Sequence, residues 1–264
     1  MQSGWLAAFR NMILLPWSIW GPTWSRRHKL NGNMFRLEVF IFGLLAVAIP
    51  YFSSNLFAGA NGVTFWDPEI ALDRQIPVIG WMIAPYMALY LYYPAVLIFN
   101  QPDDRSRLEM IAGVQMLSAL TIFCSFFFVF FPAEIDMRSD IPQSILEGNG
   151  WQSTLFATIH AMDQPFNAWP SLHIVHSYFL GRVVTRWVLK AWPTSNIAKV
   201  FVGVIWFEYI LLCISILTTK QHYLFDLATG LILAIIAWQF VLPIMEKIAN
   251  LPDNRLDLNY GSDK

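Results

Sequence analysis

The sequence predicts an all-α polytopic membrane protein, a bundle of about six transmembrane helices preceded by an N-terminal interfacial helix. Of the 264 residues, 56% are hydrophobic and 13% are charged, against roughly 25% charged residues in an average soluble domain. Aromatic residues make up 16%, including 12 Trp, which suits side chains at the headgroup level of a bilayer. The lipid bilayer is therefore an expected partner, whereas a net charge of −1 indicates no affinity for nucleic acid.

The N-terminal segment, residues 1–34, does not resemble a cleavable signal. The stretch from Trp5 to Trp24 is apolar in patches, but Arg10, Pro16 and Pro22 interrupt it and no small-residue cleavage site follows. We expect a short helix that lies on the membrane with its Trp side chains among the headgroups. A disordered tail is the alternative.

Six later stretches are long enough to cross a bilayer, which takes roughly 20 mainly apolar residues. The fourth is the least apolar, because it carries His173, His176, Arg182 and Arg186. We find no internal repeat and no linker, so residues 1–264 are expected to form one domain, with a six-helix core over 35–246 and a tail over 247–264. The predicted spans are Phe35 to Phe57, Ile76 to Phe99, Leu108 to Phe131, Ser171 to Leu189, Lys199 to Leu217 and Tyr223 to Met245.

The distribution of cationic residues predicts which side of the membrane each loop faces. The two long connections, Ala58 to Gln75 and Pro132 to Pro170, are rich in Gly, Pro, Asp and Asn, which is typical of loops. Fourteen of the 17 Lys and Arg residues fall on the side of the termini, and the other side has Arg74, Arg138 and Lys220. Positive charge accumulates on the cytoplasmic side. We expect an integral protein of a bacterial inner membrane with cytoplasmic termini and long loops that face the periplasm, or a lumen if the cell is eukaryotic.

Most ionisable residues within the predicted spans gather at the periplasmic end. His173 and His176 open the fourth span, and His222 and Asp226 lie where the fifth gives way to the sixth. Ionisable groups at membrane depth are costly and are functional by default. If this turn is helical, the i, i+4 spacing places Asp226 on the same face as His222. A carboxylate bonded to one ring nitrogen leaves the other bare, so that His222 can act as a nucleophile or base.

The start of the fourth span offers a partner for His222. Pro170 suits the first turn of a helix, Ser171 can cap it or bind an oxyanion, and free N–H groups near His173 favour a bound anion. A second histidine supplies the general acid that protonates a leaving alkoxide. The combination predicts phosphoryl transfer through a phosphohistidine, with neither a cofactor nor a metal ion.

These residues resemble the signatures of a known superfamily, the type 2 phosphatidic acid phosphatases and vanadium haloperoxidases. Asn167 to His173, which contains Pro-Ser-Leu-His, is similar to its second signature in the form found in the branch that includes inositol phosphorylceramide synthases. Thr219 to Tyr223, followed by Asp226 and Gly230, resembles the third signature, His-x-x-x-Asp. The two signatures stand about 50 residues apart, a combination more specific than either alone.

Two further stretches extend the resemblance over roughly residues 76 to 240. Ile83 to Tyr86, with Tyr90 and Pro94, is similar to an early helix of that branch, and Phe130 to Pro132 resembles the end of its third helix. The resemblance implies a membrane enzyme that hydrolyses or transfers phosphoric esters of lipids.

The resemblance also implies a role for each signature residue. His222 is expected to take up the phosphoryl group, with Asp226 as its orienting carboxylate. His173 is expected to release the alcohol and then to activate water or an acceptor, and Ser171 to bind a phosphate oxygen.

The sequence departs from the family pattern in its cations. The first signature, Lys-x6-Arg-Pro, is absent, and so is the Ser-Arg pair before the third signature, because Ser215 is followed by Ile216. We therefore assign phosphate binding to the nearby cations Lys220 and Arg138, with hydroxyl donors from Tyr86 and Tyr90.

Each of these residues also has a purely structural interpretation. His173, His222 and Asp226 could form a buried polar network between helices, and Lys220 could be a surface cation. For His176 we favour a position that simply faces the adjacent loop over a supporting role behind the catalytic residues, and for His160 a position on a loop surface. Glu208, in the middle of the fifth span, is expected to be a protonated core carboxyl bonded to a neighbouring helix rather than part of a polar path.

Our first functional hypothesis is a lipid phosphate phosphatase. The second is a phosphotransferase, in which an alcohol replaces water, as in headgroup transfer by inositol phosphorylceramide synthases. A transporter or flippase is a third, although it predicts two related halves. A zinc hydrolase using His173, His176, His222 and Asp226 is a fourth, and vanadium haloperoxidase chemistry is a fifth.

Overall fold

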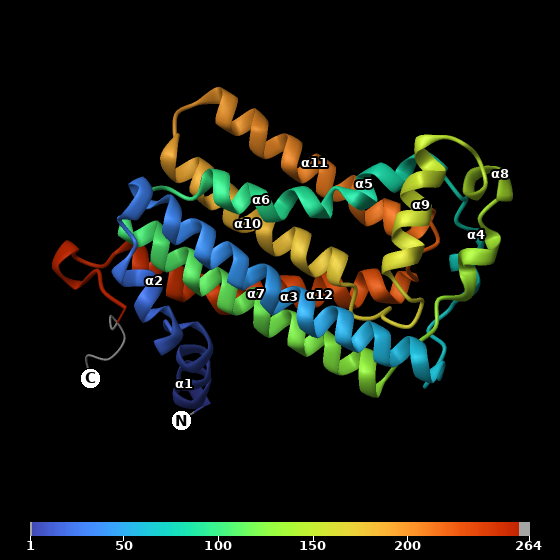
Figure 1. The fold of residues 1–264 in the computed structure, drawn as a ribbon, viewed down its shortest axis with the longest axis horizontal. Helices are drawn as coiled ribbons and strands as arrows, with labels where there is room; N and C mark the ends of the chain where they lie inside the picture. Colours follow the sequence, from blue (N-terminus) through green and yellow to red (C-terminus); the bar gives the residue numbers. More distant parts are fainter. Residues whose placement is uncertain (1, 259–264) are drawn as a thin grey trace.

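The structure is a computed structural model that describes residues 2–258, and long helices lie side by side along its longest axis (Figure 1). Within this range the regular elements are α-helices and short 3-10 helices. The all-α membrane bundle expected from the sequence is confirmed. The α-helices are α1 (Gln2–Leu14), α2 (Gly21–Ser25), α3 (Asn33–Asn61), α4 (Ala71–Gln75), α5 (Ile83–Met87), α6 (Leu89–Phe99), α7 (Asp104–Phe130), α8 (Gln143–Leu146), α9 (Trp151–Met162), α10 (Leu172–Ala191), α11 (Asn196–Thr218) and α12 (Leu224–Ala249). The 3-10 helices are η1 (Ser18–Trp20), η2 (Lys29–Gly32), η3 (Gly80–Met82), η4 (Asp136–Asp140) and η5 (Asp253–Arg255).

Five helical segments of the described chain have the length and apolar composition needed to cross a membrane. They correspond to the first, second, third, fifth and sixth predicted spans. They are Lys29–Asn61, Gly80–Phe99, Asp104–Phe130, Asn196–Thr218 and Leu224–Ala249.

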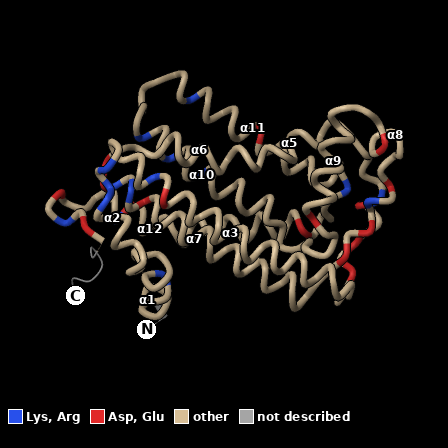
Figure 2. Tube along the Cα trace, in the orientation of Figure 1, with Lys and Arg blue, Asp and Glu red and all other residues tan. Residues whose placement is uncertain are grey.

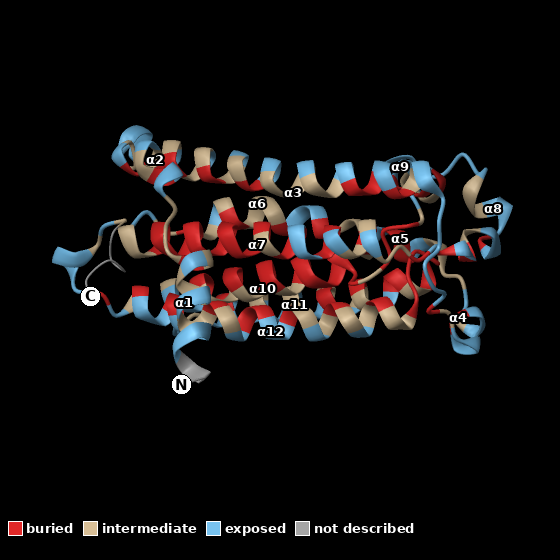
Figure 3. Ribbon diagram, turned by 90° about the horizontal axis from the view of Figure 1, so that it is seen from below, coloured by how far each residue is buried: buried red, intermediate tan, exposed pale blue. Residues whose placement is uncertain are grey.

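The fourth predicted span, α10, is long enough to cross a bilayer but is too polar to belong to that group. Its 20 residues rise about 30 Å at the helical rise of roughly 1.5 Å per residue. It packs against α6, α7, α11 and α12, and Figure 3 shows it largely buried among them. Arg186 donates to the fully buried Glu109 of α7, and the guanidinium of Arg182 lies 4.8 Å from the ring centroid of Trp238 on α12. Its neighbours therefore provide partners for these cations.

The second predicted span is broken into η3, α5 and α6. The N–H of Ala88 donates to the carbonyl of Pro85, and that of Leu91 donates to Ala88. Bonds of this i to i−3 type tighten the chain locally. The break separates two tyrosines that a continuous helix would place one turn apart: Tyr86 is fully buried, whereas Tyr90 is 40% exposed.

The two segments expected to be loops contain short helices, which corrects that expectation. The first contains α4, and the second contains η4, α8 and α9. In α9 the buried side chains are Ser153, Phe156 and Ile159, one helical turn apart, and this face packs against α5 and α8. The Gly, Pro and Asp residues around α9 obscured its short amphipathic pattern. Together these helices form the end of the bundle opposite to α1 and α2 (Figure 1).

The N-terminal segment is helical, as expected, rather than an extended tail. Helix α1 packs against α7 and α12 and projects from the bundle (Figures 1 and 3). Trp20 of η1 donates its indole N–H to Gln115 of α7 at 2.8 Å, which ties the segment to the core. Trp5 and Met12 of α1 are 65% and 66% exposed. A position in the membrane interface stays a prediction.

Candidate active site

His222 and Asp226 are in contact, but through the cap of a helix rather than through a helical turn. Helix α12 begins at Leu224, so His222 precedes it. Oδ2 of Asp226 accepts the backbone N–H of Tyr223 at 2.9 Å and lies 3.2 Å from Nδ1 of His222. A carboxylate in this position accepts Nδ1–H and leaves Nε2 without a proton. Nε2 of His222 is thereby available as a nucleophile.

The N-terminus of α10 faces this nitrogen. Oγ of Ser171 lies 3.3 Å from Nε2 of His222, and the ring centroids of His173 and His222 are 5.6 Å apart. Gly230 of α12 permits this approach, because a Cβ there would lie 3.1 Å from the carbonyl oxygen of Ser171 and 3.0 Å from Cβ of Ile174. The structure therefore brings the second and third signatures together.

Tyr86 packs against His173, and we refer to the neighbouring side chains of Tyr86, His173 and His222 as this row. The ring centroids of Tyr86 and His173 are 4.3 Å apart. The hydroxyl of Tyr86 and Nε2 of His173 are buried, and neither has a hydrogen-bond partner among the described residues. Most buried polar groups have a partner. A bound phosphate ester could supply it for both.

Two residues of the second long connection, Arg138 and His160, interact with this row or with the residue next to it. Nε2 of His160, on α9, lies 3.2 Å from Nε2 of Gln221, the residue before His222. Burial and the positive charge of Arg138 lower the pKa of His160 to about 4, and Arg138 also interacts electrostatically with Tyr86. The guanidinium Nε of Arg138 is buried and has no hydrogen-bond partner within the described chain. His160 was expected on a loop surface; instead it lies on a helix and is half-buried beside Gln221.

Lys220, by contrast, forms a structural contact outside this row. Its ammonium donates to the carbonyl oxygen of Asp73 at 2.7 Å, and its side chain is buried. The charges that act on it are those of Asp140, Arg74, Asp73 and Glu69. The interpretation as a surface cation is wrong, and the contact leaves no observation in favour of a phosphate-binding role.

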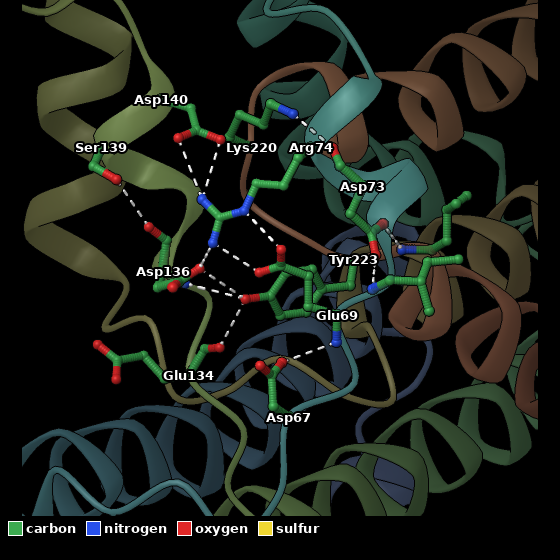
Figure 4. A network of polar contacts seen from close by, with 12 residues as sticks. Asp67, Glu69, Asp73, Arg74, Glu134, Asp136, Ser139, Asp140, Lys220 and Tyr223 are labelled. Atoms are coloured by element: carbon green, nitrogen blue, oxygen red, sulfur yellow. Dashed lines mark hydrogen bonds and ion pairs between the residues drawn. The ribbon is translucent and has the colours of Figure 1, made fainter.

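A network of acidic side chains around Arg74 holds the loops in this region (Figure 4). Arg74 donates to Glu69, Asp136 and Asp140. The hydroxyl of Tyr223 donates to the carbonyl of Glu134 at 3.1 Å and lies 3.2 Å from Asp136.

Two anchors in this network fix the peptide that carries His222. Tyr223 connects it to the turn that carries Arg138, because its hydroxyl accepts the N–H of Asp136, two residues before Arg138. Asp73 accepts the N–H of Leu224 at 2.8 Å. The distance between Arg138 and His222 therefore depends on contacts made by Tyr223 and Asp73.

An apolar cavity of about 150 Å³ adjoins His173 and extends between α3, α6 and α10. Tyr90, assigned to phosphate binding from the sequence, lines this cavity, and no contact places it against His173 as Tyr86 is placed. His176 lines it too, but both of its ring nitrogens have partners, Tyr93 at 2.7 Å and Thr121 at 3.2 Å. His176 is buried between these two partners and does not face the adjacent loop, which corrects our expectation. The residues around the cavity are Leu44, Val47, Ala48, Tyr51, Phe52, Leu89, Tyr90, Tyr93, Leu172, His173 and His176.

Asp163, Tyr51 and Asn167 form a polar group at the edge of the cavity that sequence reasoning missed. The hydroxyl of Tyr51 donates to Oδ1 of Asp163 at 2.5 Å, and the amide of Asn167 donates to the same oxygen at 2.5 Å. The sequence did contain a signal for His160 and Asp163. Each follows a buried residue of α9 by four positions, Phe156 and Ile159 respectively, and therefore lies on the same side as that residue. Tyr51, on a helix more than 100 residues away, gave none.

Within the described residues, no group of three or more His, Cys, Asp or Glu side chains is arranged to hold a metal ion. His176, one of the four ligands of a hypothetical zinc site, is engaged by Tyr93 and Thr121. The geometry therefore gives no support to the zinc hydrolase hypothesis.

Comparison with protein families identifies the chain as a member of the PAP2 superfamily. The family model matches residues 71–240, more than half of the chain, and this range contains His173, His222 and Asp226. A search of curated proteins and a search of solved structures returned no match. The chain thus belongs to the superfamily that the signatures suggested, and its membership supports a phosphatase-type phosphoesterase activity.

Proposed function

We propose that this member of the PAP2 superfamily is a membrane phosphatase that cleaves phosphoric esters of lipids through a phosphohistidine at His222. The observation that carries the proposal is the arrangement of His222: Nδ1 bonds to Asp226, and Nε2 faces Ser171 and His173. A nucleophile oriented by a carboxylate and placed beside a general acid is the usual arrangement for covalent catalysis.

The reaction proceeds in two steps. Nε2 of His222 attacks phosphorus, the P–O bond to the lipid breaks, and protonated His173 gives its proton to the leaving oxygen. Water then attacks phosphorus while His173 takes a proton from it, the P–N bond breaks, and inorganic phosphate leaves. Ser171, Tyr86 and Arg138 bind the non-bridging oxygens and stabilise the charge on them.

The cavity beside His173 supports a lipid as the substrate. Its lining is mainly aliphatic and aromatic, and it touches the histidine that protonates the leaving group. A lipid whose acyl or isoprenoid chain lies in this cavity places its phosphoester oxygen next to His173. The lipid is then the alcohol released in the first step.

Charge distribution supports a periplasmic active site in a bacterial inner membrane. Charged residues concentrate at the two ends of the bundle, and long uncharged stretches separate them (Figure 2). The end with α1 and α2 carries most of the cations, whereas the end with the site carries the acidic network of Arg74 (Figures 2 and 4). Cations favour the cytoplasmic side, so the substrate approaches from the outer leaflet.

The proposal is tested by phosphate release from a panel of lipid phosphates, including phosphatidic acid and polyprenyl phosphates, with ³²P trapping of the phosphoenzyme. His222→Ala is expected to lose both the phosphoenzyme and the activity. His173→Gln is expected to lose more activity toward an alkyl phosphate than toward p-nitrophenyl phosphate, because only the alkyl alcohol needs a proton to leave. His28→Ala, far from the site, is the matched control. Full activity of His222→Ala would falsify the mechanism.

Transfer of the phosphoryl group to an alcohol is a second candidate function, favoured by the small number of cations at the site. Lys220 bonds to Asp73, and Arg138 is the guanidinium that interacts with Tyr86 and His160. With fewer cations, a substrate of lower charge is held more easily. Product analysis with added glycerol or inositol separates the two functions: a phosphate monoester of glycerol or inositol indicates transfer, and inorganic phosphate alone indicates hydrolysis.

A further inference from the structure

Glu208 is an acidic residue in the middle of an otherwise apolar membrane helix, α11. Neither the phosphate site nor the acidic network at the end of the bundle uses it. An ionisable side chain at this depth is costly and is functional by default. Its surroundings therefore indicate which ligand it could serve.

The carboxyl of Glu208 has only one of its two oxygens paired. Oε2 accepts the hydroxyl of Tyr92, on α6, at 2.5 Å, and the same hydroxyl lies 3.1 Å from the carbonyl oxygen of Ile205. This bond to a neighbouring helix agrees with the expectation from the sequence. Oε1 is buried and has no hydrogen-bond partner in the described part of the chain. The bond between α6 and α11 uses Oε2 and does not account for the buried, unpaired Oε1.

Glu208 lines a groove of about 220 Å³ between α6, α10 and α11. Helix α11 packs against α5 and α10. In Figure 1 it diverges from α6 toward the C-terminal end of α6. Leu91 and Val204, on the two sides of the groove, are 70% and 57% exposed. In a membrane these exposed walls face the acyl chains, so the occupant is a lipid. The lining residues are Ala88, Leu91, Tyr92, Ala95, Val184, Phe201, Val204, Ile205 and Glu208.

The polar atoms of the groove restrict the chemistry of that lipid. No Lys, Arg or His lines it, so a phosphate or carboxylate headgroup finds no counter-charge there. A pure hydrocarbon leaves Oε1 of Glu208 unpaired, which is unfavourable in an apolar environment. An uncharged hydroxyl both donates and accepts a hydrogen bond and matches a carboxyl group.

We propose that this groove binds the hydroxyl end of an uncharged lipid alcohol, which forms a hydrogen bond with Oε1 of Glu208 while its chain lies along α6 and α11. The groove is distinct from the cavity at His173. That cavity is lined by Tyr90 and Tyr93 of α6, whereas the groove is lined by Leu91, Tyr92 and Ala95 of the same helix. The proposal thus does not depend on the proposed phosphatase activity.

Photo-crosslinking with a diazirine-bearing dodecanol tests the proposal on the full-length protein in a lipid bilayer. We expect labelled peptides from α6 and α11, and protection by excess 1-dodecanol but not by dodecane. In Glu208→Leu, labelling is expected to fall about fivefold, the effect of losing roughly one hydrogen bond. Ala95→Trp, which fills the groove and leaves the carboxyl in place, is expected to lose labelling as well.

Two further variants keep the outcomes distinct. His222→Ala is expected to label like the wild type, which separates this site from the phosphate site, and the thermal stability of each variant shows that it is folded. Equal protection by dodecane, or unchanged labelling of α6 and α11 in folded Glu208→Leu, would overturn the proposal.

Discussion

The phenol ring of Tyr86 lies against the imidazole of His173, with 4.3 Å between the ring centroids and 34° between the ring planes. Because the Tyr86 hydroxyl is buried without a partner among the described residues, we infer that it donates to a phosphate oxygen of the substrate. Tyr86→Phe keeps the ring contact and removes this donor. We expect kcat/KM for a lipid phosphate to fall by about 10- to 100-fold, the range for a hydrogen bond to a charged group.

The control for Tyr86→Phe is Tyr209→Phe, which removes a buried phenol hydroxyl from α11 in the same apolar cluster as Tyr86. Unchanged kinetics in Tyr86→Phe, with the fold intact, would mean that the hydroxyl does not touch the substrate.

Arg138 and Lys220 are expected to respond differently to neutralisation. Arg138→Gln removes the charge assigned to phosphate binding, so kcat/KM should fall by about 10- to 100-fold, mainly through KM. Lys220→Met keeps the apolar stem and removes the bond to the Asp73 carbonyl. It should lower the thermal stability while kcat/KM stays within about threefold, because no substrate contact is lost. An equal loss of kcat/KM in both variants would mean that Lys220 binds the phosphate, as the sequence predicted.

The cavity between α3, α6 and α10 is expected to select for chain length. Ala48 lines it, and Ala48→Trp should fill part of it. For a dodecyl phosphate, kcat/KM should fall by about tenfold, the cost of leaving roughly two methylene groups outside an apolar site. For propyl phosphate it should not change. Ala95→Trp, in the groove at Glu208, is the matched control, and an equal effect of both substitutions on both substrates would argue against a lipid chain in the cavity.

His160 gives a prediction for pH. Burial and Arg138 lower its pKa in the folded protein to about 4, below the roughly 6.5 of an unperturbed imidazole. The unfolded state therefore binds the proton first as pH falls. The contribution of neutral His160 to the free energy of unfolding is complete above about pH 6.5, and it is lost as the pH falls from there toward 4.

Nuclear magnetic resonance of ¹³C-labelled histidine checks this prediction, with His160→Gln used for assignment. The His160 signal should stay that of a neutral ring between pH 5 and 8. In Arg138→Gln its pKa should rise part of the way toward the ordinary value, since burial remains. A pKa that does not change in that variant would place the guanidinium away from His160.

The membrane character, the helical spans and the pairing of the two signatures followed from the sequence. The first two depend on local information, because an apolar stretch of sufficient length must satisfy its backbone hydrogen bonds internally in lipid. The two signatures are about 50 residues apart, and their meeting was expected from their common membrane depth. Within the third signature, Asp226 follows His222 by four positions wherever the chain goes. The chain between them forms a helix cap rather than a helical turn, and the two side chains are in contact all the same.

Only the tertiary structure decided what each polar side chain near the site does. Lys220 bonds to the carbonyl of Asp73, 147 residues away in the chain. A local sequence pattern cannot predict a contact between residues so far apart. His160 faces Gln221 because α9 buries one face against α5 and α8. Hydrophobic periodicity tells where a helix forms, whereas the partner of a charged or polar side chain is set by packing between segments that are remote in sequence.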